Sequence, residues 1–146
     1  MRHLELTAAD VMTVHPETVQ MDESLEMVRA RMRRGGYHHV LVLDGPVLVG
    51  VLSERDLLRA LSPNLSTASE TGRDLATLRK RAHQVMTHHP LVATPDTPLV
   101  TLVDALRDRP IGSVPIVDEQ GHPIGIVTWR DLLFAAYPQS QPVEPG

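Results

Sequence analysis

Two stretches of nine residues decide the fold: GVLSERDLL at residues 50–58 and GIVTWRDLL at residues 125–133. Both run from a glycine through two apolar residues to a hydroxyl residue, and both end in RDLL. A hydroxyl residue followed three positions later by an acid is typical of a helix N-terminus, because both side chains can bond free backbone N–H groups. One such stretch predicts only a helix start. Its second copy predicts a chain built from a repeat.

The repeat extends well before these stretches. The triplet VMT at residues 11–13 returns at residues 85–87. The offset grows by one residue at a turn, which runs through residues 44–46 in the first copy and 118–121 in the second. An insertion costs least at a hairpin tip, so we expect a hairpin there. Further matched pairs are His15-Pro16 with His89-Pro90, Leu25 with Leu99, Val40 with Val114, and Asp44 with Asp118.

Hydrophobic spacing predicts the same elements in each copy. The expected elements are extended segments near residues 18–20 and 91–93; amphipathic helices carrying Leu25, Val28 and Met32 or Leu99, Leu102, Val103 and Leu106; strands at 39–43, 47–52, 114–117 and 124–127; and a second helix from Ser53 or Thr128. Thr97 is the expected N-cap of its helix, with Pro98 at the first helical position. We expect the strands to be buried on both faces and both leucines of each RDLL to point inward.

The predicted division of the chain is a first module at residues 8–61, a linker with a short helix at 62–82, a second module at 83–137 and a disordered tail at 138–146. In the linker helix, Leu75 and Leu78 are expected to face inward and the basic run at residues 79–81 to be solvated. One copy is too small to bury a good core alone. Two β-α-β-β-α copies packed about a pseudo-two-fold axis would form an α/β (α+β) protein with two related clefts.

The composition excludes several classes of function. The 146 residues carry a net charge of −4 with a pI near 6.0, which is no electrostatic footprint for nucleic acid. Cysteine is absent, so disulfides, thiolate catalysis and cysteine-ligated zinc are excluded. No apolar run approaches the roughly 18 residues of a membrane span, and the initial MRHLELTAAD has charges where a signal peptide needs an apolar core. We expect a cytoplasmic protein without nucleic-acid or membrane partners.

Metal binding and catalysis find little support in the sequence. Adjacent histidines at residues 38–39 and 88–89 point to opposite faces of a strand, so each pair offers a metal one ligand at most. The sequence has no H-E-x-x-H, no Walker A or G-x-G-x-x-G loop, and no G-x-S-x-G. We therefore predict no metal site, no catalytic cofactor and no enzyme activity.

The order of these motifs resembles a pair of CBS domains, the family named after cystathionine β-synthase. Each copy has V-M-T near its start, an apolar strand ending in aspartate, and G-h-h-[ST]-x-x-D before a helix, where h is apolar; the match covers roughly residues 8–137. The resemblance implies a regulatory module, commonly a homodimer, that binds AMP, ADP, ATP, NAD or S-adenosylmethionine between its two copies and signals to a protein partner. The alternative is a protein-interaction module with vestigial clefts.

The family's nucleotide contacts carry over by motif position. The motif aspartate meets the ribose hydroxyls, and the motif hydroxyl lies near ribose or phosphate. In the regulatory subunit of AMP-activated kinase, a His-Arg pair reaches the phosphate; this chain has His38-His39 at that place. The implied contacts are Asp56 and Asp131; Ser53 and Thr128; Thr13 and Thr87; Tyr37, His38, Ile111 and Gly112 around the adenine, with Leu91 beside it; His39, Arg55 and Arg130 near the phosphate.

Two departures from the family pattern favour the second copy. The first copy has Leu41 where the second has the family's proline, Pro115, and Glu54 places a like charge beside the proposed phosphate. We therefore expect the Asp131 cleft, rather than the Asp56 cleft, to hold the ligand. Helix capping alone is the competing interpretation of both aspartates. The two interpretations are compatible, because a helix N-terminus also attracts anions.

Overall fold

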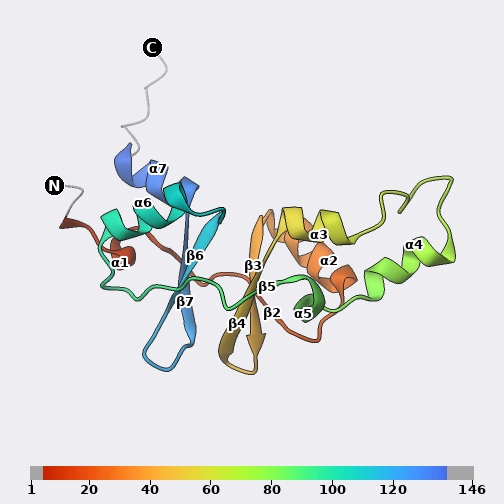
Figure 1. Cartoon of the computed structure of the whole chain (residues 1–146), viewed down its shortest axis with the longest axis horizontal. Helices are drawn as coiled ribbons and strands as arrows, with labels where there is room; N and C mark the ends of the chain where they lie inside the picture. The colour runs from red at the N-terminus through yellow and green to blue at the C-terminus, as the bar shows by residue number, and fades with distance from the viewer. Residues whose placement is uncertain (1–4, 138–146) are drawn as a thin grey trace, which may run out of the picture.

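Two β-sheets stand side by side at the centre of the molecule, with helices flanking each of them (Figure 1). The structure is a computed structural model that describes residues 5–137. In chain order the elements are α1 (Ala8–Val11), β1 (Thr13–Val14), β2 (Thr18–Gln20), α2 (Leu25–Gly35), β3 (His39–Asp44), β4 (Val47–Ser53), α3 (Glu54–Ala60), α4 (Gly72–Ala76), the 3₁₀ helix η2 (Thr77–Arg79), α5 (Ala82–Val85), β5 (Thr87–His88), α6 (Leu99–Asp108), β6 (Ser113–Val117), β7 (Pro123–Thr128) and α7 (Trp129–Ala136). The α/β class expected from the repeat is confirmed.

Two expectations concern the limits of the described chain. The tail predicted to be disordered lies outside residues 5–137. Within that range, no helix combines the length and the apolar composition needed to cross a bilayer.

Each repeat contributes one antiparallel hairpin, β3 with β4 and β6 with β7. The extra residue of the second copy lies in the turn between β6 and β7, as predicted. Gly45 and Gly121 take left-handed φ values of 63° and 81° in the two turns, a conformation that favours glycine. The residues of β6 are all buried, and so are the four central residues of β3, because both faces of these strands are covered.

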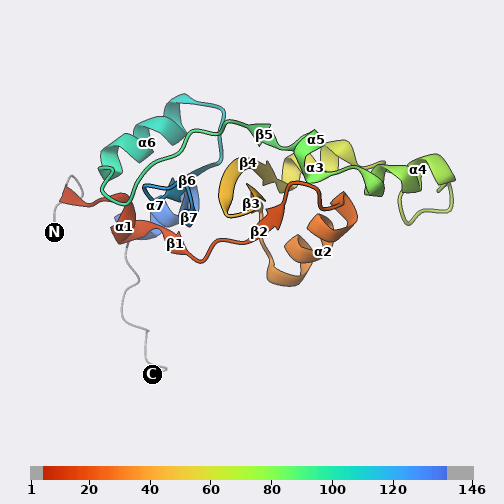
Figure 2. The same cartoon turned by 90° about the horizontal axis from the view of Figure 1, so that it is seen from below.

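The short strand that opens each repeat joins the sheet of the other repeat. β1 pairs with β7 and β5 with β4, whereas β2 returns to its own repeat and pairs with β3. Figure 2 shows β1 and β5 on these opposite sheets. His15 and His89 lie in the turns after β1 and β5, with φ of 54° and 49°. The repeated His-Pro pairs therefore mark the places where the chain crosses back to its own sheet.

The hydrophobic cores follow this exchange. The core of the first sheet includes Ala82 and Met86 from the second repeat. The core of the second sheet includes Ala8 from the first repeat. Leu41 of β3 and Ile126 of β7 share a third cluster between the two sheets. Each core is thus completed by the segment that opens the other repeat.

The two long amphipathic helices begin differently. Ser24 caps α2 with its side chain, whereas the predicted start of α6 is wrong by one residue. The helix begins at Leu99, and Pro98 rather than Thr97 is its N-cap. The Thr97 hydroxyl accepts the backbone N–H of Thr94 at 3.0 Å. It closes the preceding turn and therefore does not bond the helix.

Three leucines predicted to face the core are exposed. The first leucine of each RDLL is buried, but the second, Leu58 or Leu133, is exposed. Successive residues on a helix point about 100° apart. When the first leucine of each pair packs on the core, the second therefore points toward the surface. In the linker, Leu78 is buried and Leu75 is exposed, because the 3₁₀ turn η2 rather than α4 packs against α2.

Candidate functional site

Helices α3 and α7 both begin with the predicted cap. The backbone N–H of Ser53 donates to Asp56 Oδ2 at 3.0 Å, and Ser53 Oγ accepts the N–H of Asp56 at 3.1 Å. The N–H and hydroxyl of Thr128 donate to Asp131 Oδ2 at 2.8 Å and 3.2 Å. Capping is confirmed for both motifs. Ligand contact by either aspartate stays a prediction.

The strand exchange brings a further predicted residue to Asp131. Thr13 lies on β1, opposite Ile126 of β7. Its hydroxyl donates to Asp131 Oδ1 at 2.7 Å. We call Thr13, Thr128 and Asp131 the Asp131 site. Both carboxylate oxygens of Asp131 are therefore engaged by the protein itself.

The equivalent residues of the first motif are arranged differently. Thr87 on β5 lies opposite Val51 of β4, so it belongs with the first motif; we call Ser53, Asp56 and Thr87 the Asp56 site. Asp56 uses Oδ2 for the cap. Within residues 5–137, Asp56 Oδ1 has no hydrogen-bond donor, and Thr87 makes no bond to Asp56. The two aspartates thus differ in how much of the carboxylate is free to accept.

Asp56 also lines a hollow of ≈ 450 Å³. The walls include Arg59 from α3 and Lys80 from the segment before α5. Lys80 is exposed, as the sequence predicts for the basic run, and its Nζ donates to the Ala60 carbonyl at 3.4 Å. Two cationic side chains therefore stand around the same hollow as the partly free carboxylate.

Sequence reasoning missed Arg59 and Lys80 as site residues. Lys80 reaches α3 because α5 packs on the first repeat's core, and local sequence does not report that exchange. One signal for Arg59 was available. Phe134 holds the equivalent position after the second RDLL, so the two repeats differ in charge there.

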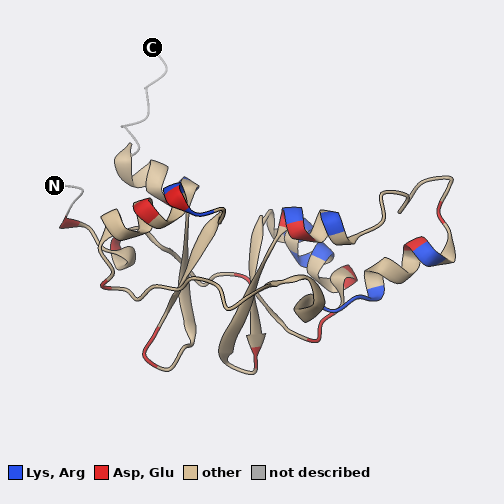
Figure 3. Cartoon of the chain, in the orientation of Figure 1, with Lys and Arg blue, Asp and Glu red and all other residues tan. Residues whose placement is uncertain are grey.

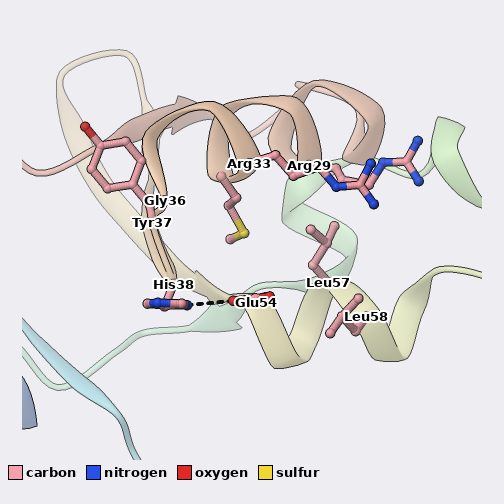
Figure 4. Close-up of a pocket in the computed structure, with 9 residues that line it drawn as sticks. Arg29, Arg33, Gly36, Tyr37, His38, Glu54, Leu57 and Leu58 are labelled. Atoms are coloured by element: carbon pink, nitrogen blue, oxygen red, sulfur yellow. Dashed lines mark hydrogen bonds and ion pairs between the residues drawn. The ribbon is translucent and has the colours of Figure 1, made fainter.

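Tyr37 and His38 face another hollow, of ≈ 260 Å³, between α2 and α3 (Figure 4). Glu54 lines the same hollow, and its Oε2 lies 2.6 Å from His38 Nδ1. Asp56 is not among the lining residues. His38 nevertheless lies directly beside the Ser53–Asp56 motif, because the Glu54 N–H donates to the His38 carbonyl oxygen at 2.8 Å and His39 pairs with Ser53 across the hairpin. Contact of Tyr37 and His38 with an adenine stays a prediction. Because Glu54 faces His38, its negative charge is also a weaker objection to the Asp56 site.

His39 contacts the second copy at Gly112. A Cβ added to Gly112 would lie 2.9 Å from His39 Nε2, so the imidazole fills the space beside this predicted adenine contact. Burial lowers the pKa of His39, the neighbouring His38 lowers it further, and Asp56 opposes both effects. His39 therefore offers less positive charge to a phosphate than an ordinary histidine would.

The remaining predicted contacts are spread around the two sites. Leu91 and Ile111 are half-buried, and Ile111 packs on the second core. Arg55 and Arg130 are exposed, with the Arg130 guanidinium carbon 5.3 Å from the centre of the Phe134 ring. No group of three or more His, Asp or Glu side chains suited to a metal occurs among the described residues.

The lowered pKa of His39 predicts that the free energy of unfolding falls as the pH drops from about 7 to about 5. The unfolded chain takes up a proton near the ordinary pKa of 6.5, whereas folded His39 takes it up at lower pH. Protonation therefore favours unfolding. Urea unfolding across this range should show a flatter pH profile for His39→Gln than for the wild type. The exposed His88→Gln serves as control, and a wild-type slope in His39→Gln would contradict the assignment.

Comparison with known sequences assigns both repeats to one family. The CBS domain family matches twice, at residues 8–63 and 82–137. A CBS domain-containing protein of Dictyostelium discoideum is 28% identical over 130 residues, which cover 88% of this chain and 89% of that protein. The next two curated relatives are longer, and the chain spans 27% and 23% of their lengths.

Solved structures of CBS proteins share the fold. CBSX2 of Arabidopsis thaliana, solved in complex with AMP, is 28% identical with a TM-score of 0.75, covering 90% of this chain and 96% of that one. The cytosolic domain of the Mg²⁺ channel MgtE, solved in complex with ATP, is 27% identical with a TM-score of 0.71, covering 90% of this chain and 49% of that one. The two family matches and the shared fold show that the chain belongs to the CBS domain family and carries two CBS domains in tandem.

Proposed function

We propose that this chain is a regulatory module that binds a phosphorylated adenosine ligand, such as AMP, ADP or ATP, at the Asp56 site. One observation carries the proposal: Asp56 keeps an oxygen free beside a hollow of ≈ 450 Å³ that also holds Arg59 and Lys80. A carboxylate oxygen accepts from ribose hydroxyls, and the two cations attract phosphate. The AMP and ATP complexes of CBSX2 and MgtE support this ligand class.

This choice of site departs from the preference drawn from the sequence. A ribose at Asp131 would have to share Oδ1 with the Thr13 hydroxyl or replace it, because Oδ2 already accepts two bonds of the cap. A ribose at Asp56 displaces no protein donor from Oδ1. His39 also occupies the space beside Gly112, next to the predicted adenine position of the second copy. Both aspartates stay predictions as ligand contacts, and we rank Asp56 first.

The charges around the hollow also rank the ligands. S-adenosylmethionine carries a sulfonium cation, which Arg59 and Lys80 would repel, whereas the phosphates of AMP, ADP, ATP or NAD would be attracted. Exposed cations are screened by salt, so this preference should shrink as the ionic strength rises.

Calorimetric titration of the full chain with AMP, ADP, ATP, NAD and S-adenosylmethionine tests the proposal. We expect at least one phosphorylated ligand to bind with a Kd of about 1 mM or tighter, and S-adenosylmethionine to bind more weakly. A second titration at high salt should reduce the difference. The proposal fails if no phosphorylated ligand binds, or if S-adenosylmethionine binds best.

A protein-interaction module without a ligand is the second candidate. The Thr13–Asp131 bond favours it, because this bond closes one site with the protein's own groups. Absence of binding in every titration, together with a stably folded chain, would support this candidate. Signalling to a protein partner, a cytoplasmic location and the absence of catalysis are expectations of either function; turnover of any nucleotide would contradict the last.

A further inference from the structure

The hollow of ≈ 260 Å³ between α2 and α3 has a cationic end. Arg29 and Arg33 of α2 line it, and Figure 4 shows both side chains extending toward the same end of the hollow. Arg31 of the same helix pairs with Glu17 and Glu23. Within residues 5–137, Arg29 and Arg33 form no such ion pair. Two guanidinium groups therefore stand at one end of the hollow without an acid of the described chain beside them.

The spacing of these two arginines is electrostatically unfavourable. Residues four apart on a helix are neighbours, and like charges at this spacing repel each other. Helix α2 carries four arginines and one acid, Glu26, and Figure 3 shows basic residues on this helix. An anion held between Arg29 and Arg33 would relieve the repulsion.

The second repeat neutralises the equivalent charge. Val103 holds the position of Arg29, so the pair of cations is absent there. Arg107 is the counterpart of Arg33, and it bonds two aspartates of α6 at 2.9 Å and 3.0 Å. The open cationic pair is thus a property of the first repeat alone and not of the repeated fold.

Apolar side chains line the hollow beside the arginines. We call Met32, Leu57 and Leu58 the apolar wall. Leu58 is 62% exposed, so a hydrocarbon group placed against it would remove apolar surface from water. Among the nine lining residues Glu54 is the only acid, and its Oε2 lies 2.6 Å from His38 Nδ1. Figure 4 places this pair at the end of the hollow away from the arginines, so its charge does not compete for them.

We propose that this hollow binds a small amphipathic carboxylate, with the carboxylate between Arg29 and Arg33 and the hydrocarbon body against the apolar wall. Guanidinium groups bind carboxylates through short, charge-assisted hydrogen bonds. No residue lines both this hollow and the one at Asp56, although α3 contributes to each of them. The site therefore serves a second ligand, and its occupancy does not depend on the proposed nucleotide.

Calorimetric titration of the full chain with octanoate and with 1-octanol tests the proposal. The two probes share a hydrocarbon chain of the same length and differ in the charge of the head group. We expect octanoate to bind with a Kd of about 1 mM or tighter, and 1-octanol at least about tenfold more weakly. Equal binding of the two probes, or no binding of octanoate, would overturn the proposal.

Substitutions on α2 identify the groups that hold the carboxylate. Arg29→Gln with Arg33→Gln should weaken octanoate binding at least about tenfold, and it should not destabilise the fold because it removes a repulsion. Arg34→Gln is the matched control, since Arg34 is exposed on the same helix and does not line the hollow. An equal loss of affinity in the control would contradict the assignment to Arg29 and Arg33.

Methyl NMR of the six methionines locates the bound octanoate. Met32 lines the hollow, whereas Met12 and Met86 lie beside the motif glycines. We expect the Met32 methyl signal to move during the titration and those of Met12 and Met86 to stay in place. Movement of Met12 or Met86 instead would place the ligand elsewhere. Loss of octanoate affinity as the chain concentration rises would show that a second copy, and not a carboxylate, fills the hollow. Either result would overturn the proposal.

Discussion

Asp56→Ala should weaken binding of a phosphorylated adenosine ligand about tenfold to a hundredfold. The variant removes the carboxylate oxygen that is free to accept ribose hydroxyls, and a charge-assisted hydrogen bond contributes about 1.5–3 kcal/mol. Removing the acid also removes one cap bond of α3, which costs roughly 1 kcal/mol of folding free energy. Titration calorimetry of the folded variant, checked by circular dichroism, measures the change in Kd.

Two further variants separate ligand contact from capping. Asp131→Ala removes the matching cap of α7, and we expect it to leave the affinity of the first site within about twofold of the wild type. Asp74→Ala removes a similar cap from α4, where Asp74 Oδ2 accepts the N–H of Thr71 at 2.8 Å, and Asp74 is not among the residues that line the Asp56 hollow. A loss of ligand affinity in Asp131→Ala with none in Asp56→Ala would favour the Asp131 site, which the sequence analysis preferred. Equal losses of ligand affinity in Asp56→Ala, Asp131→Ala and Asp74→Ala would show that the substitutions act only through the stability of the fold.

Gly50→Ala should destabilise the chain by about 2–3 kcal/mol. A Cβ at this position would collide with the Met86 side chain and would lie 2.9 Å from the Thr87 carbonyl oxygen. Because that oxygen belongs to backbone, relief requires β5 to move away from β4. The same movement would carry Thr87 away from Ser53 and Asp56, the other two residues of the Asp56 site. Urea unfolding should show a lower midpoint, and ligand affinity should fall as well.

Gly72→Ala is the matched control for this substitution. No atom lies within 4 Å of a Cβ at Gly72, and alanine favours the helix that begins there. We expect a free energy of unfolding within about 0.5 kcal/mol of the wild type, or slightly higher. A stability loss in Gly72→Ala equal to that in Gly50→Ala would contradict the close approach of β5.

The repeat in the sequence was sufficient to predict the fold class and both helix caps, because hydrophobic spacing and the Ser/Thr-x-x-Asp pattern are local. It did not predict which sheet receives β1 and β5. These strands are two residues long, and such a strand has no periodicity that selects a partner. The contribution of Lys80 to the Asp56 hollow depends on that choice, so it was missed for the same reason.

The glycine that opens each decisive stretch has a physical role that the sequence alone does not report. Gly50 lies beside Met86 and Thr87, and Gly125 lies beside Met12 and Thr13, so each glycine admits the strand arriving from the other repeat. The motif glycine is therefore needed because a side chain at this position would block the close approach of the other repeat's strand. The sequence presents it only as part of a helix-start signal.

The exchange of opening segments makes the duplicated chain one cooperative folding unit. Neither repeat can complete its core alone, since Ala82 and Met86 belong to the first core and Ala8 to the second. Loss of order in one repeat therefore removes packing from the other, and we expect a single unfolding transition. A ligand held at one aspartate would raise the free energy of unfolding of both repeats by mass action. A ligand bound by one repeat would therefore also make unfolding of the distant repeat less frequent.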